Sequence, residues 1–168
     1  MIKINYSDTE LITKNGIDEK KFTEIAEKIT ENIIKSDILP QSSLAETDFA
    51  QNDVSVDIML CDNGTIQAIN KDYRSKDAPT DIITFALFAD SEPAMRVIAD
   101  GEIPLGEIII SLEQIRIQAQ EFKKTFEEEL YFILAHGILH LFGFTHQTDE
   151  TLQNMIEIQK RLVSDVKI

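Results

Sequence analysis

The chain contains three histidines, and all of them fall in one short segment: His136, His140 and His146. Residues four apart lie on the same face of an α-helix, so His136 and His140 can direct their imidazole nitrogens to one point. Gly143 follows the second histidine, and glycine readily adopts the positive φ that ends a helix and turns the chain back toward that point. Three neutral imidazoles with an open fourth position are typical of a catalytic zinc site.

The spacing is that of the metzincin proteases, H-E-x-x-H-x-x-G-x-x-H, except that Gly137 stands where those enzymes have glutamate. In a zinc protease this glutamate is the general base that takes a proton from the attacking water. Glycine cannot do so, and the sequence therefore predicts a metzincin-like metal site with a different chemistry. The alternative is that the histidines are core or capping residues without a metal, although burying three imidazoles without partners would be unfavourable.

Composition places the chain among ordinary globular proteins. Its 168 residues, 43% of them hydrophobic, can bury a substantial core, and we expect one domain over residues 1–168. The first residues do not have the pattern of a signal peptide, and the apolar stretch from Leu130 to Phe144 is too short to span a membrane, so no membrane partner is expected. The lone Cys61 excludes an intrachain disulfide and favours a reducing, cytoplasmic location.

The hydrophobic pattern predicts four strands. Alternating apolar residues indicate strands at Ile2–Tyr6 and Val54–Leu60, and the continuous apolar runs Ile82–Leu87 and Gly106–Ile110 are typical of more buried strands. About five helices are predicted from apolar residues at helical spacing, beginning near Asp18, Asp62, Ser111, Thr125 and Asp149.

The order of these elements favours an α+β fold in which a roughly four-stranded sheet packs against the histidine-bearing helix. Thr125 and Glu128 form a candidate capping box at the start of that helix. Two polar stretches, 36–53 and 88–104, are longer than usual connections and could be mobile lids or variable loops, with solvated loops as the default interpretation.

Several blocks of the sequence resemble the bacterial YbeY family of rRNA-maturation endoribonucleases. The segment H-G-x-L-H-L-x-G-x-x-H from His136 resembles the family signature. Two further blocks are N-x-x-Y-R-x-x-D-x-P-T-D-I from Asn70 and L-G-E-I-I-I-S from Leu105, and the last helix, with Gln159, has a comparable pattern. The order and spacing of the blocks match over most of the chain from Val54 onward.

The chain departs from the family pattern at a few positions. Thr145 stands where an aspartate commonly precedes the third histidine, Glu107 replaces the usual aspartate of the strand block, and Thr84-Phe85-Ala86 replaces Ser-Phe-Pro. Thr145 removes a carboxylate that could orient the surroundings of a metal, but the three histidines are intact.

The resemblance implies a single-strand-specific endoribonuclease in 16S rRNA maturation and ribosome quality control, with one Zn²⁺ per chain on His136, His140 and His146. It also implies a functional arginine at Arg74. The reacting phosphodiester accumulates negative charge, and a guanidinium can hold two phosphate oxygens at once. The nucleophile could be water activated by the metal or the 2′-hydroxyl of the RNA.

Other interpretations of the charged residues are open. Arg74 lies in a polar run that could be a solvated turn. Asp77 and Asp81 could support the metal ligands or cap an element, and Thr80-Asp81 before a strand is more typical of a turn than of a catalytic pair. The formal net charge of −14 opposes general attraction to nucleic acid, with Lys71, Arg74 and Lys76 as the basic cluster near the expected cleft. We therefore expect single-stranded RNA or rRNA to be presented by ribosomal particles or ribosomal proteins.

Two other functions are consistent with a metal site. One is a metal-dependent hydrolase of another substrate such as a peptide, against which Gly137 argues. The other is a non-catalytic ribosome-assembly factor with a structural metal.

Overall fold

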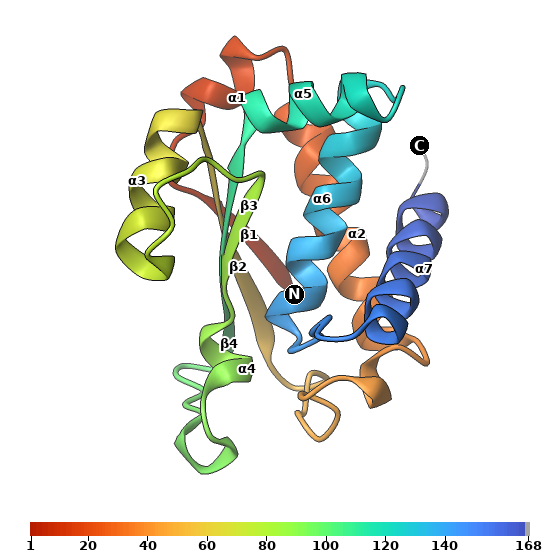
Figure 1. Cartoon of the computed structure of the whole chain (residues 1–168). Coiled ribbons are helices and arrows are strands. Elements are labelled where there is room, and N and C mark those ends of the chain that lie inside the picture. The colour runs from red at the N-terminus through yellow and green to blue at the C-terminus, as the bar shows by residue number, and fades with distance from the viewer. Residues whose placement is uncertain (167–168) are drawn as a thin grey trace.

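The computed structural model describes residues 1–166, and its centre is a mixed four-stranded sheet with helices on both faces (Figure 1). The strands are β1 (Ile2–Tyr6), β2 (Asp53–Cys61), β3 (Ile82–Phe85) and β4 (Glu102–Ser111). They lie in the order β1-β2-β4-β3, with β1, β2 and β4 parallel and β3 antiparallel to β4. As a result β3 is an edge strand, and within residues 1–166 no strand pairs with its second edge.

The α-helices of the described residues are α1 (Glu10–Lys14), α2 (Glu19–Lys35), α3 (Asn63–Arg74), α4 (Leu87–Asp90), α5 (Leu112–Glu121), α6 (Phe126–Leu141) and α7 (Asp149–Asp165). The chain also forms 3₁₀ turns at Leu39–Gln41 and Pro93–Met95. Helices α2, α6 and α7 lie on one side of the sheet and α3 on the other (Figure 1). None of these helices has the length and hydropathy needed to span a bilayer.

The predicted α+β fold is confirmed, including its four strands and its five longer helices, α2, α3, α5, α6 and α7. Helices α1 and α4 were not predicted, because five and four residues are too few for a periodic pattern to show. Strand β3 is shorter than predicted, since Leu87 already begins α4. Strand β4 begins at Glu102 rather than Gly106, so the end of the predicted 88–104 loop belongs to the sheet.

Helix α6 is the central helix of the core. The predicted capping box is present at its start, where the Thr125 side chain accepts from the Glu128 backbone and the Glu128 side chain accepts from the Thr125 backbone. The apolar face of the helix is buried and includes Leu130, Ile133, Leu134, Ile138 and Leu141. The helix packs against β3 and β4 on one side and against α2 and α7 on others, which fixes the position of its C-terminal end.

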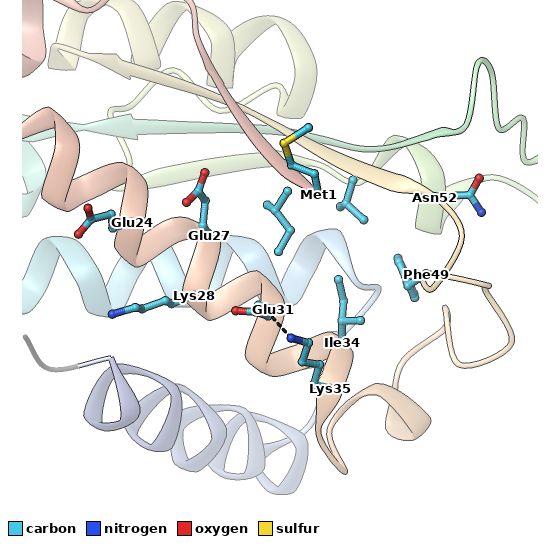
Figure 2. Close-up of a pocket in the computed structure, with 11 residues that line it drawn as sticks. Met1, Glu24, Glu27, Lys28, Glu31, Ile34, Lys35, Phe49 and Asn52 are labelled. Carbon is cyan, nitrogen blue, oxygen red and sulfur yellow. Dashed lines mark hydrogen bonds and ion pairs between the residues drawn. The ribbon is translucent and has the colours of Figure 1, made fainter.

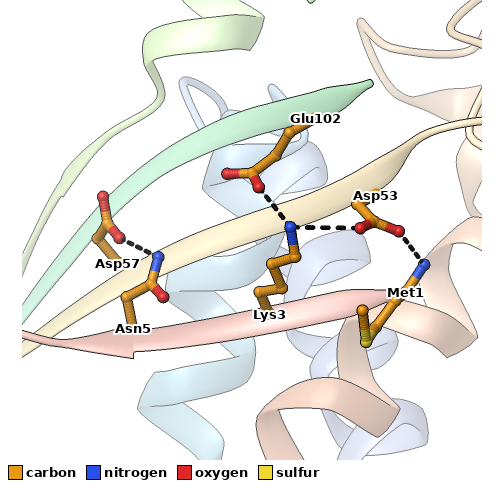
Figure 3. A network of polar contacts seen from close by, with 6 residues as sticks. All are labelled: Met1, Lys3, Asn5, Asp53, Asp57 and Glu102. Carbon is orange, nitrogen blue, oxygen red and sulfur yellow. Dashed lines mark hydrogen bonds and ion pairs between the residues drawn. The ribbon is translucent and has the colours of Figure 1, made fainter. Parts of the chain in front are cut away.

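A polar network ties the three parallel strands together on the sheet face that points away from α2 (Figure 3). The Lys3 ammonium on β1 lies 3.2 Å from a carboxylate oxygen of Asp53 on β2 and 2.7 Å from one of Glu102 on β4. Asn5 on β1 donates to Asp57 on β2 at 2.9 Å. Because these side chains are partly exposed, the network specifies the register of the strands more than it stabilises the fold.

The sheet contains a bulge that depends on Gly106. The register of β2 and β4 shifts between Ser55, which pairs with Pro104, and Val56, which pairs with Gly106. Gly106 has a φ of +138°, a region that favours glycine, and a Cβ at this position would lie 1.9 Å from the carbonyl oxygen of Phe85.

We expect Gly106→Ala to destabilise the protein by about 3 kcal/mol or more, because both backbone strain and a clash with β3 oppose the side chain. Gly101→Ala is the matched control, since Gly101 also has a positive φ, of +74°, but has no atom within 4 Å of its Cβ position. Gly101→Ala should lower the free energy of unfolding, measured by urea denaturation, by about 1 kcal/mol. Equal losses for the two variants would contradict the close packing of β4 on the end of β3.

Candidate metal centre

The C-terminal end of α6 and the turn after it bring the three histidines together. His136 and His140 lie one helical turn apart, with their Nε2 atoms at 2.9 Å. Gly143 has a φ of +84° and donates its backbone N–H to the His140 carbonyl, which turns the chain as predicted. The centroid of the His146 ring then lies 5.3 Å from the ring centroid of His136 and 5.1 Å from that of His140. One ring nitrogen of each histidine lies within 4.8 Å of the others, close enough to hold one metal ion.

The second nitrogen of each helical histidine is held by a hydrogen-bond acceptor. The Nδ1 of His140 lies 2.8 Å from the backbone carbonyl oxygen of Phe144, and the Nδ1 of His136 lies 3.2 Å from the Oε1 of Gln159 on α7. Gln159 is buried and donates its Nε2 to the Phe132 carbonyl, so its Oε1 is the atom that faces His136. Both imidazoles therefore carry their proton on Nδ1 and direct an Nε2 lone pair into the site.

Two unprotonated nitrogens that face each other at 2.9 Å repel unless a cation lies between them. A proton on one of the two nitrogens would also relieve the repulsion, but the protonated state is disfavoured. Burial lowers the pKa of His136, and burial together with the neighbouring His136 lowers the pKa of His140 to about 4. The neutral state is the state that binds metals. The donor set and its outer hydrogen bonds thus fit a metal ion.

The histidines form one wall of a cavity of about 420 Å³. Its other walls come from the end of α3, from the segment before β3 and from β3 itself. The lining residues there are Arg74, Thr80, Asp81, Ile82 and Thr84. The predicted position of Arg74, in the same cavity as the histidines, is confirmed. Within residues 1–166 its guanidinium makes no hydrogen bond or ion pair, so its donors are available to an anionic ligand.

The two aspartates near Arg74 form hydrogen bonds within the protein. Asp81 accepts from the Ile82 backbone N–H at 2.8 Å and from Gln118 at 3.1 Å, which fixes the entry to β3, and it also lines the cavity. Asp77 is exposed and lies 2.9 Å from the Lys71 ammonium, outside the cavity lining. Lys71 is therefore engaged with a carboxylate and does not add to the free positive charge near Arg74.

Gly137 allows α6 to lie directly on the sheet. A Cβ at this position would be 2.8 Å from Cδ1 of Ile82 and 3.0 Å from Cγ2 of Ile108. A side chain at the position that carries the catalytic glutamate in metzincins would require these isoleucines to shift, and with glycine here the chain has no carboxylate at that position.

A larger hollow, of about 690 Å³, lies between α2 and the β1–β2 end of the sheet (Figure 2). Its lining contains charges of both signs, among them Glu31 and Lys35, which form an ion pair. Among residues 1–166, the three histidines are the one group of metal-ligand side chains close enough to share an ion. The smaller cavity is therefore the candidate functional site.

The sequence and the fold both match known proteins. A family model described as "Endoribonuclease YbeY" matches residues 10–167. The chain belongs to the YbeY endoribonuclease family. The endoribonuclease YbeY of Bacillus pumilus is 37% identical over 158 residues, which cover 93% of this chain and 92% of that protein. The Bacillus subtilis protein of the same name is 42% identical over 121 residues, which cover 71% of this chain and 76% of that protein. The fold is similar to a solution structure of TM1509 from Thermotoga maritima, with a TM-score of 0.53 and 29% sequence identity. The match covers 99% of this chain and 89% of the TM1509 chain.

Membership in the YbeY family supports an RNA-cleaving hydrolase, with RNA as the substrate.

The residues that orient the histidines could not be assigned roles from the sequence. Gln159 lies in a family-like helix without any feature that marks it as a partner of His136. The Phe144 contact is made by a backbone carbonyl, which every residue has, so no sequence signal could identify it.

We expect Gln159→Leu to weaken zinc binding by about 10- to 100-fold, because it removes the acceptor that orients His136. His140→Ala should lose the metal altogether. Gln153→Leu, on the exposed side of the same helix, is the matched control and should bind zinc like the wild type. Affinity is measured by competition with a chromophoric chelator, with circular dichroism to verify folding. Wild-type affinity in Gln159→Leu would contradict the role of Gln159.

Proposed function

We propose that this YbeY-family chain is a zinc-dependent, single-strand-specific endoribonuclease that acts in the cytoplasm in 16S rRNA maturation and ribosome quality control. The observation that carries the proposal is the unpaired Arg74 guanidinium in the same cavity as three converging imidazoles. A cluster of metal ligands next to a free guanidinium suits a phosphodiester, whose reaction builds up negative charge on the phosphate.

His136, His140 and His146 would hold one Zn²⁺ per chain, because three imidazoles with an open position suit this ion. When bound, zinc supplies Lewis-acid polarisation of a phosphoryl oxygen or activation of water. Gln159 and the Phe144 carbonyl hold the two helical imidazoles with their lone pairs toward the ion.

Arg74 would clamp two oxygens of the scissile phosphate and stabilise the charge that develops on them. This role is compatible with the position of Arg74 at the end of α3, where its side chain is exposed and forms no ion pair within residues 1–166. Since Gly137 excludes a general base beside the first histidine, this stabilisation would carry more of the catalysis than it does in a zinc protease.

The substrate would be RNA presented by ribosomal particles or ribosomal proteins. With a net charge of −14, and with Lys71 bound to Asp77, the chain has little positive potential to attract free RNA. Arg74 and Lys76 are the side chains of the predicted basic cluster that form no ion pair in the described residues. An assembled partner would supply the affinity that these two charges do not.

We expect Arg74→Ala to lower the cleavage rate of single-stranded RNA by about 100-fold or more, corresponding to ~3 kcal/mol of lost transition-state stabilisation. Zinc content and melting temperature should stay near wild type, because the side chain is exposed and unpaired. Arg74→Lys should recover part of the rate, since a point charge cannot bind bidentately. Lys76→Ala is the matched control outside the cavity lining. Wild-type cleavage by Arg74→Ala would contradict the mechanism.

The same preparations distinguish the two competing functions. Zinc-loaded and metal-free protein are incubated side by side with single-stranded RNA and with a peptide mixture. The proposal predicts cleavage of RNA alone, and only by the zinc-loaded protein. Peptide cleavage would favour another hydrolase, and no cleavage of either substrate would favour a non-catalytic assembly factor.

A further inference from the structure

Tyr73 is an exposed aromatic side chain next to the candidate site. The chain has three tyrosines and no tryptophan. Tyr131 is buried and Tyr6 is partly buried with its hydroxyl bound to Thr23, whereas Tyr73 is 72% exposed. Folding normally buries aromatic rings because they contribute much apolar area, and an exposed ring beside a cavity can offer its face to a ligand.

The ring of Tyr73 is held in place from one side. It contacts Phe85 of β3 in an edge arrangement, with ring centroids 5.0 Å apart and planes at 67°. Phe85 in turn packs on the apolar cluster under α3, which includes Ile83 and Ile109. The ring is thus supported by the core and still presents most of its surface to solvent.

Tyr73 and Arg74 are consecutive residues at the end of α3 with different surroundings, since the Tyr73 ring contacts Phe85 and Arg74 lines the histidine cavity. Successive strand residues point to opposite faces of a sheet. Thr84 lines the histidine cavity together with Arg74, whereas its neighbour Phe85 faces α3 and carries Tyr73. Helix α3 and helix α6 flank the sheet on its two sides (Figure 1). A chain that crosses the edge of β3 can therefore meet Arg74 and Tyr73 within one short stretch.

We propose that Tyr73 is a stacking platform for one base of single-stranded RNA, adjacent to the phosphate bound by Arg74. The inference rests on the proposed endoribonuclease function and assigns a substrate subsite to it. Stacking on an aromatic side chain requires an unstacked base, which single strands offer and duplexes do not. The platform would therefore contribute to single-strand preference without selecting a sequence.

The charge of the protein favours a contact of this kind. A chain with a net charge of −14 repels phosphates at long range, and few free cations lie near the cavity. Base stacking does not depend on net charge and is insensitive to salt compared with phosphate contacts. It adds affinity at the point where electrostatic attraction is weak.

We expect Tyr73→Ala to raise the KM for single-stranded RNA by about 5- to 150-fold, which corresponds to ~1–3 kcal/mol for one stacked base. The kcat should change much less, and Tyr73→Phe should behave like the wild type because the ring is kept.

The salt dependence of RNA affinity distinguishes the role of Tyr73 from that of Arg74. Tyr73→Ala should keep the wild-type slope of log affinity against log salt, whereas Arg74→Ala should reduce it by about 0.7. Phe122→Ala is the matched control, since Phe122 is 60% exposed and follows α5, before the start of α6 and thus away from its histidine end.

A direct readout uses Tyr73→Trp, which introduces the single tryptophan of the chain. Its fluorescence should be quenched in the first phase after stopped-flow mixing with an RNA oligonucleotide, and should change little with an abasic oligonucleotide of the same length. Equal quenching by both, or an unchanged KM in Tyr73→Ala while the wild type cleaves RNA, would overturn the stacking platform alone. Failure of the wild type to bind or cleave RNA would overturn the proposed function as well.

Discussion

The site depends on the close contact between α6 and the sheet at Gly137. Because this residue has no side chain, the helix lies against Ile82 and Ile108, where a Cβ would be only 2.8 Å and 3.0 Å from their methyl groups. Ile82 also lines the histidine cavity, so the same contact sets how close His136 comes to the edge strand. The same packing opposes a side chain such as the glutamate of metzincins at this position. The proposed mechanism therefore relies on charge stabilisation by a bound metal and Arg74 rather than on a glutamate at this position.

The third histidine depends on parts of the chain that are distant in sequence. A Cβ on Gly143 would lie 1.9 Å from the Ser43 hydroxyl, which donates to the Phe142 carbonyl at 3.3 Å. Arg96 donates to the carbonyl of Ser43 at 3.3 Å and to those of Phe88 and Ala89 at 2.9 Å and 3.1 Å. The two long connections thus pack together against the turn that precedes His146. Solvated loops were the default prediction for them, but they contact the turn that carries the third histidine.

Periodic patterns and side-chain chemistry explain what could be predicted from the sequence. The spacing of the histidines, the Gly143 turn and the Thr125 capping box are local features, and the structure has them where they were predicted. The position of Arg74 beside the histidines could be predicted only through the family resemblance, because nothing in local spacing relates α3 to α6. Contacts such as Gln159 with His136 and Arg96 with Ser43 join distant segments, and the bulge at Gly106 results from strand pairing. Such contacts follow from tertiary packing and leave no pattern in a single sequence.

The dependence of RNA cleavage on metal stoichiometry tests the central claim most directly. Protein freed of metal by a chelator is titrated with zinc, and the initial rate of cleavage of a fluorescent single-stranded RNA is measured at each addition. The account predicts no cleavage by the metal-free protein and a rate that rises linearly and stops rising at one zinc per chain. Full cleavage by the metal-free protein, or a rate that does not respond to zinc at this stoichiometry, would contradict it.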